Sequence, residues 1–326
     1  MLLPNIFIKY FMLTNMSFMA MLSLFMNDIM NIWFMMEINN FMFISYLSYS
    51  MKNKKMIFFY FTIQIIPSLM LILMIIMSSL LITKSNLEMS LLYISLMIKL
   101  GIPPFHFWMP MISMYMSWMN LFFLLTVQKI IPFSILSIMN DKNSIMLIMV
   151  TLSSIIPPIM MMTQLKFKLL LTYSSINQSS WMIMLIFMKN IFWVVYMINY
   201  TIFTMLIFYF INFYKMSFNY LYLNFNMIML MMMLNMAGMP PFSFFMFKWL
   251  SIFIFMFNSM NLFMLFMLMM ISSLMMFFMY LRMMYMSMFL KLSSSKLIKM
   301  NIYYTDFNKS IIWILAMALS MMIIMI

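Results

Sequence analysis

The chain has 326 residues, of which 67% are hydrophobic and only 7% are charged. A soluble domain of this size carries about 25% charged residues because it needs a polar shell, so this composition excludes a water-soluble globular fold. The formal net charge of +13 does not indicate nucleic-acid binding, because the lysines stand singly or in small groups between apolar segments. Lysines in that position orient helices in a membrane.

The residue types that hold cofactors are almost missing. The chain has no cysteine, which excludes disulfides, thiolate metal sites and iron–sulfur clusters held by cysteine. The single histidine, His106, excludes a haem held by two histidines. No glycine-rich phosphate loop, dinucleotide fingerprint or Ser/His/Asp constellation is present. We therefore expect no cofactor and no metal on this chain.

Apolar segments recur along the whole chain, and about 20 residues are enough to cross the roughly 30 Å hydrocarbon core as a helix. A transmembrane barrel would need alternating apolar and polar residues, which these segments lack. The sequence predicts an all-α integral membrane protein, a single polytopic domain over residues 1–326, with a polar loop at 291–309. We expect about eleven transmembrane helices, near residues 3–26, 29–48, 56–82, 89–108, 117–139, 144–162, 169–187, 191–214, 226–255, 262–281 and 310–326.

Lysine placement predicts the orientation. Segments on the N-terminal side of the membrane carry eleven lysines, Lys166 and Lys168 among them, against three on the opposite side. The N-terminus is therefore expected inside, and an odd number of spans puts the C-terminus outside. The 60 Met and 37 Phe indicate an AT-rich gene in which ATA encodes Met, as in animal mitochondria. Inside is then the matrix, and outside is the intermembrane side of the inner membrane.

Both glycines of the chain occur in related phrases within apolar segments. Residues 101–108 are GIPPFHFW and residues 238–245 are GMPPFSFF. Proline removes a backbone donor and glycine permits dihedrals that other residues avoid. We expect two broken helices, at Gly101, Pro103 and Pro104 and at Gly238, Pro240 and Pro241, although a chance match of two loop turns would look the same. Broken helices at corresponding positions of two halves are typical of transporter folds built from repeats.

Four charged residues lie near the centres of expected spans: Glu37, Lys99, Lys129 and Lys248. A central charge costs about 2.5–3.5 kcal/mol on insertion scales, so such groups face the bundle interior and find partners. Dehydration disfavours the charged form of both residue types, which lets them take up and release protons. A static ion pair could account for one Glu–Lys couple, but not for three lysines against one carboxylate. We interpret the four as a proton relay.

The expected breaks lie beside titratable groups. Lys99 precedes Gly101 by two residues and His106 follows it, while Lys248 follows the second break. Backbone freed at a break is satisfied by water or by polar side chains that line a cavity. His106 is therefore either a proton shuttle at the first break or a hydrogen-bonded structural residue.

Several motifs resemble one known family. Residues 98–108 (IKLGIPPFHFW), 126–129 (TVQK), 173–176 (YSSI), 237–242 (AGMPPF) and 248–249 (KW) look like signatures of the NADH dehydrogenase subunit 2 family. Residues 33–40, which contain Glu37, resemble its first acidic span. The matches run in family order from near residue 30 to near 250, and beyond about 285 only the hydropathy is similar.

The resemblance implies an antiporter-like membrane subunit of respiratory complex I with two inverted repeats, the first near residues 1–140 and the second near 144–285. A C-terminal loop and last helix would occupy 286–326. It pairs Glu37 with Lys99, makes Lys129 the central lysine and places Lys248 on the second broken helix. Gln178 departs from the family, which usually has a titratable histidine at that position.

The resemblance also implies partners and cofactors. NADH, FMN, iron–sulfur clusters and ubiquinone would be bound elsewhere in the complex, and the neighbours would be other antiporter-like and small membrane subunits. Lipids, cardiolipin among them, would surround the chain, and no nucleic acid is expected. Two other functions would share the broken helices and buried lysines: a cation/proton antiporter working alone, and a non-conducting scaffold subunit whose buried charges only fix assembly.

Overall fold

The computed structural model describes residues 2–80, 86–139, 144–164, 166–213, 227–240, 242–258 and 263–294. These residues are almost entirely helical, so the all-helical class expected from the sequence is confirmed. The span expected at 310–326 and most of the loop expected at 291–309 lie outside the described residues. The helices are α1 (Leu2–Leu22), α2 (Ile29–Ser50), α3 (Lys54–Leu80), α4 (Asn86–Leu100), α5 (Trp108–Ser113), α6 (Trp118–Leu125), α7 (Val127–Ile138), α8 (Ser144–Met162), α9 (Phe167–Phe187), α10 (Phe192–Phe213), α11 (Met227–Ala237), α12 (Ser243–Asn258) and α13 (Phe263–Ser294).

Membrane-spanning length and apolar composition are present in several parts of the described chain. Five helical segments there are long and apolar enough to cross a bilayer: Lys54–Met77, Trp118–Ile138, Ser144–Met162, Phe192–Asn212 and Phe263–Met283. Two shorter apolar helices, Met89–Leu100 and Ser243–Met256, adjoin the glycines. The chain is therefore a membrane protein, while the number of about eleven spans stays a prediction.

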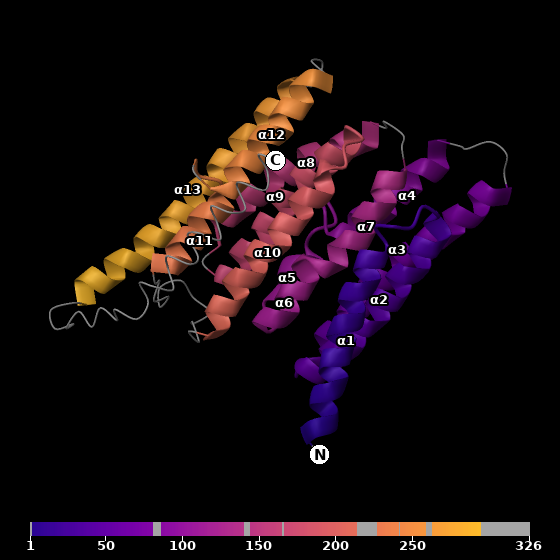
Figure 1. The fold of residues 1–326 in the computed structure, drawn as a ribbon, viewed down its shortest axis with the longest axis horizontal. Helices are drawn as coiled ribbons and strands as arrows, with labels where there is room; N and C mark the ends of the chain where they lie inside the picture. Colours follow the sequence, from indigo (N-terminus) through magenta and orange to yellow (C-terminus); the bar gives the residue numbers. More distant parts are fainter. Residues whose placement is uncertain are drawn as a thin grey trace.

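The helices lie side by side, and the chain crosses the molecule from one end to the other (Figure 1). The N-terminal helices α1 to α3 form one end, α11 and α13 lie toward the other, and α9 lies between them. Helix α2 packs on α1, α3 and α7, and α8 packs on α9 and α13. This arrangement places the two expected breaks in different halves of the bundle.

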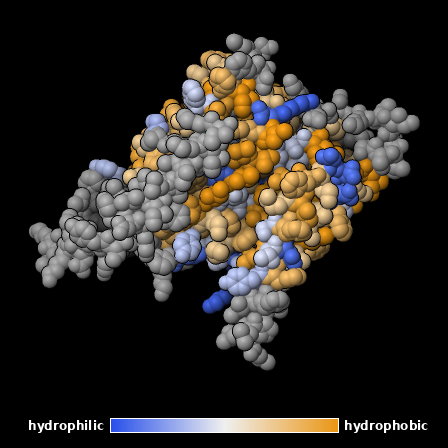
Figure 2. Space-filling model, viewed as in Figure 1, coloured by the Kyte–Doolittle hydropathy of each residue, from blue (hydrophilic) through white to orange (hydrophobic). Residues whose placement is uncertain are grey.

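The outer surface suits lipid. Figure 2 shows hydrophobic residues over most of the described part of one face. Large apolar side chains are exposed on the outer helices, such as Phe58 on α3, Ile202 on α10 and Leu274 on α13. Soluble monomers rarely expose apolar surface this extensively. The exposed apolar side chains are those that the hydrocarbon core of a bilayer solvates.

Helix α9 is the buried centre of the bundle, since every residue of it except Leu169 is buried. It is nevertheless rich in polar residues, including Thr172, Ser174, Ser175 and Ser180. Their hydroxyl groups donate to carbonyl oxygens three residues earlier in the same helix. A polar helix thus tolerates an apolar environment because most of its hydroxyl donors are satisfied internally.

Three expected spans contain more than one helix. The segment 89–108 holds the last part of α4 and the start of α5, and 226–255 holds α11 and most of α12. The segment 117–139 was expected as one span but holds two helices, α6 and α7, with Thr126 between them at φ −118° and ψ −76°. Proline at position 132 of α7 cannot donate to the carbonyl of Gln128, so backbone bonding is weakened close to this junction.

Candidate functional site

Gly101 ends helix α4 in a left-handed conformation, with φ of +64°. Its N–H donates to the carbonyl of Ile98 at 3.2 Å, and the N–H of Ile102 donates to Met97 at 3.0 Å. These two bonds form a Schellman motif, which requires a residue at positive φ and so favours glycine. The indole N–H of Trp108 also donates to Ile98, at 3.1 Å, and ties the start of α5 to the end of α4.

Gly238 ends α11 in the same way, with φ of +77°. Its N–H donates to Asn235 at 2.9 Å, and the N–H of Met239 donates to Leu234 at 3.3 Å. The two related phrases therefore terminate their helices by one mechanism. Pro241, the last residue of the second phrase that was singled out, lies outside the described residues.

Glu37 and Lys99 are in contact, as the sequence predicts. Lys99 lies in the last turn of α4 and Glu37 in the middle of α2, and Nζ is 3.2 Å from Oε1. The same Nζ lies 3.3 Å from the sulfur of Met36. The lysine side chain is 1% exposed and the glutamate side chain 16%. Lys99 depends on this contact, because removing the carboxylate would leave the lysine buried without compensation.

Lys129 is buried between α7 and α9. Its ammonium donates to the carbonyl oxygen of Ser175 at 3.0 Å and lies 3.3 Å from the Ser175 hydroxyl. Both partners are neutral, unlike the carboxylate that faces Lys99. A buried ammonium with neutral partners is held in place by hydrogen bonds, but among the described residues no carboxylate beside it compensates its charge. This combination is chemically suited to taking up and releasing a proton.

Gln178 continues the polar face of α9 one turn beyond Ser175. Its side-chain oxygen accepts a hydrogen bond from the hydroxyl of Tyr196 on α10, and both residues are buried. The ring of Tyr196 packs against Phe244 and Phe247 of α12. Gln178, which departs from the family pattern, therefore has a hydroxyl partner that the sequence did not reveal.

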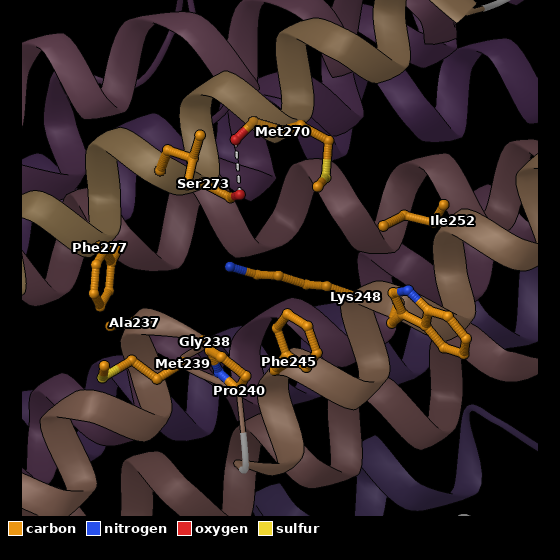
Figure 3. A pocket seen from close by; sticks show the side chains of 12 residues that line it. Ala237, Gly238, Met239, Pro240, Phe245, Lys248, Ile252, Met270, Ser273 and Phe277 are labelled. Atoms are coloured by element: carbon orange, nitrogen blue, oxygen red, sulfur yellow. Dashed lines mark hydrogen bonds between the residues drawn. The ribbon is translucent and has the colours of Figure 1, made fainter.

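Lys248 lies on α12 and points its ammonium into a cavity of about 280 Å³ (Figure 3). The cavity lies between the second glycine phrase, α12 and α13. A Cβ atom on Gly238 would lie 3.0 Å from Nζ, so the missing side chain leaves room for the ammonium. On the side of α9, Nζ lies 5.9 Å from the ring centre of Trp181. Lys248 itself is 6% exposed.

Polar side chains surround the second glycine phrase, and sequence reasoning did not single them out. The side-chain oxygen of Asn235 accepts from the Ser243 hydroxyl at 3.2 Å and from the N–H of Phe244 at 3.3 Å. The side-chain amide of Asn199 lies 3.5 Å from the same hydroxyl. The cluster joins α10, α11 and the start of α12. Serine at the start of a helix is a recognisable capping signal, but its asparagine partners come from tertiary structure.

His106 lies between α4 and α5 and is buried. Its ring centre is 4.3 Å from that of Phe107 and 6.5 Å from that of Tyr173 on α9. Neither ring nitrogen makes a hydrogen bond of ordinary geometry to the described residues. The backbone of Pro104 is the polar neighbour of the ring, so the structural alternative, a histidine held by a hydrogen bond, stays open beside the shuttle.

Lys168 was counted from the sequence among the lysines on the inside of the membrane, next to the span expected at 169–187, and the structure buries it. Its ammonium donates to the carbonyl of Met116 and lies 5.1 Å from the ring centre of Trp118. The contact fixes the chain between α5 and α6 to the first turn of α9. Burial was not predictable, because the Met116 carbonyl becomes available only where α5 ends.

No direct contact joins the three lysines of the expected relay. Helix α9 lies between two of them, with Ser175 at Lys129 and Trp181 near Lys248. These contact points are six residues apart, about 9 Å along a helix. In the residues that the structure describes, no three His, Cys, Asp or Glu side chains lie together as metal ligands would.

Comparison with known proteins gives consistent matches. Residues 80–276 match the profile of the NADH:quinone oxidoreductase/Mrp antiporter transmembrane family. The chain is 36% identical over 263 residues to NADH-ubiquinone oxidoreductase chain 2 of Rhipicephalus sanguineus, covering 77% of this chain and 81% of the relative.

Two solved structures share the fold. A chain of respiratory complex I from Thermus thermophilus aligns with a TM-score of 0.75 at 18% identity, covering 84% of this chain and 69% of that one. A chain of the Mrp complex from Dietzia sp. DQ12-45-1b aligns with a TM-score of 0.66 at 12% identity, covering 78% and 56%.

Proposed function

The chain belongs to the NADH:quinone oxidoreductase/Mrp antiporter family of membrane subunits, and we infer from this that it is a proton-translocating subunit of respiratory complex I. The observation that carries the inference is the set of lysines buried in the bundle, one paired with Glu37 and two with neutral surroundings. A scaffold would need only the compensated pair.

We propose that Glu37, Lys99, Lys129 and Lys248 form the proton relay, together with His106 beside the first helix break. When the Glu37–Lys99 pair is closed, the carboxylate stabilises the charged lysine. When a neighbouring event separates the pair, desolvation favours the neutral lysine, and its proton is released toward Lys129. Ser175 and the polar face of α9 would then conduct it in the direction of Lys248.

The same proposal assigns the two glycine phrases to discontinuous transmembrane helices. In this assignment α4 and α5 are parts of one interrupted helix of the first repeat, residues 1–140. Likewise, α11 and α12 are parts of its counterpart in the second repeat, residues 144–285. The equal geometry at Gly101 and Gly238 supports the assignment. Discontinuous helices in two repeats typically carry the binding and conduction residues of transporters.

The setting proposed for the chain is the mitochondrial inner membrane, with its N-terminus toward the matrix and its C-terminus toward the intermembrane side. Neighbouring antiporter-like and small membrane subunits, with lipids such as cardiolipin, would cover its apolar outer faces. NADH oxidation on FMN, electron transfer through iron–sulfur clusters and reduction of ubiquinone would take place on other subunits. This chain would contribute the transfer of protons across the membrane, which that redox chemistry drives.

The similarity to a chain of the Mrp complex favours a second candidate, a cation/proton antiporter that does not depend on complex I. Blue-native electrophoresis of mitochondrial membranes, followed by an in-gel stain for NADH dehydrogenase activity, separates the two. A complex I subunit migrates in a band of very high mass that stains for the activity. Migration only at lower mass, away from the stain, would refute membership of complex I and favour the second candidate.

A further inference from the structure

The cavity beside Lys248 has the composition of a ligand pocket. Its volume of about 280 Å³ is close to the lower end, roughly 300 Å³, of the range for small-molecule sites. Most of its wall is apolar, including Met239, Phe245, Ile252 and Phe277. The polar side-chain groups that line it are the ammonium of Lys248, the hydroxyl of Ser273 and the indole N–H of Trp249.

Among the residues that the structure describes, no acidic side chain forms an ion pair with the ammonium in this pocket. Lys248 is buried, and Figure 3 shows its Nζ pointing into the space between Gly238 and Ser273. The Ser273 hydroxyl donates to the carbonyl of Met270 at 2.8 Å, so its hydrogen is already used and the ammonium of Lys248 is the charged donor in the pocket. A buried cation is stabilised most by an anion that also accepts hydrogen bonds.

The pocket also reaches the lipid-facing surface. Two of its lining residues, Trp249 on α12 and Leu274 on α13, are 58% and 64% exposed. A molecule dissolved in the bilayer could therefore enter between these two helices without crossing water. Water alone suits such a pocket poorly, because a buried water needs two to four polar partners and most of the wall is apolar.

We propose that this cavity binds the carboxylate end of a single-chain amphiphile, such as a long-chain fatty acid. The carboxylate pairs with the Lys248 ammonium, and the alkyl chain lies against Phe245, Ile252 and Phe277 and leaves between Trp249 and Leu274. A single acyl chain with a compact anionic head fits the volume better than a phospholipid, whose phosphodiester head carries two chains. Binding as such does not depend on whether Lys248 transfers protons.

Photolabelling of the intact respiratory complex in nanodiscs tests the proposal. The probe is palmitic acid with a diazirine on its chain, and the labelled peptides are identified by mass spectrometry. Label is expected on α12 and α13 near Trp249 and Leu274. Unlabelled palmitate should compete, whereas methyl palmitate should compete at least about tenfold more weakly, since it lacks the negative charge that pairs with the Lys248 ammonium.

Two variants at the mouth of the pocket provide a matched pair. Leu274→Trp places an indole in the opening and should lower labelling about tenfold or more, which corresponds to a loss of about 1.4 kcal/mol. Ile271→Trp, one turn away on α13 and 56% exposed but outside the lining, should label as the natural chain does. Both changes lie on an exposed helix face and so test blocking with little effect on folding.

Three results would overturn the proposal. Equal competition by the methyl ester would show that the pocket takes apolar chains without recognising charge. Stronger competition by phosphatidylglycerol would show that the anion belongs to a phospholipid. Absence of label from residues 243–277 would show that water or another part of the protein fills the cavity. Labelling is measured independently of proton translocation. A failure of the labelling experiment would therefore leave the proposed proton translocation untouched, and a failure of proton translocation would leave the binding proposal untouched.

Discussion

Replacing Glu37 by Gln keeps the shape of the side chain and removes the charge that faces Lys99. Two unit charges 3.2 Å apart attract by about 5 kcal/mol at an effective dielectric constant of about 20. The Glu37 side chain is 16% exposed, so solvent screening reduces this figure, and we take about 3 kcal/mol, the lower end for breaking a buried pair. Losing that free energy shifts the balance between the closed and the open pair about a hundredfold.

If the relay requires the pair to close and open, proton translocation per NADH oxidised should fall at least about tenfold in Glu37→Gln, even when only part of the hundredfold shift is expressed. The measurement uses purified complex in liposomes, with a pH-sensitive dye for translocation and absorbance for NADH oxidation. Asp28→Asn is the control, because Asp28 precedes the same helix, is exposed and accepts a hydrogen bond from the side-chain amide of Asn31 at 3.0 Å. Wild-type stoichiometry in assembled Glu37→Gln complex would refute the role of the pair.

Three further changes test other parts of the structure. Lys129→Ala removes an ammonium of the proposed relay and, with it, the cost of burying that charge. Proton translocation should therefore fall strongly while blue-native gels show normal assembly. Unchanged translocation would exclude Lys129 from the relay. Gly238→Ala forces a side chain into φ +77° and puts a Cβ 3.0 Å from Lys248 Nζ. The assembled complex should therefore lose about 1–3 kcal/mol of stability, which is measured as a lower unfolding temperature. An unchanged unfolding temperature would show that the end of α11 relaxes around the new side chain. Arg282→Leu removes a 3.1 Å bond to the carbonyl of Met162 and should cost about 1.5–3 kcal/mol in the same assay, whereas Arg282→Lys should restore part of it; equal loss in both would point to packing instead of the bond.

The parts of the site that were predictable depend on scarce residues. Glycine occurs twice, and at both positions the chain needs a positive φ that other residues avoid. One carboxylate lay near the centre of an expected span, so the partner of Lys99 had few alternatives. Scarcity made these assignments specific even though methionine and phenylalanine fill most of the chain.

The parts that were missed depend on neighbours distant in sequence. Lys168 was expected only as an orienting lysine at the inside end of a span, but the end of α5 places the Met116 carbonyl beside it. The junction at Thr126 carries no glycine, and the apolar residues on both sides continue the hydropathy of one span. The hydrogen bond between Tyr196 and Gln178 joins two helices whose packing the sequence does not encode locally.

Helix α13 is longer than a bilayer is thick. Its 32 residues extend about 48 Å at 1.5 Å per residue, against a hydrocarbon core of roughly 30 Å. The apolar window ends at Met283, and Arg282 binds the last carbonyl of α8 at the same level. The end of α8 and Arg282 of α13 therefore lie at the same depth, where α13 leaves the hydrocarbon core. A thicker or thinner membrane would have to deform around the protein, or the protein would have to tilt, to keep this depth.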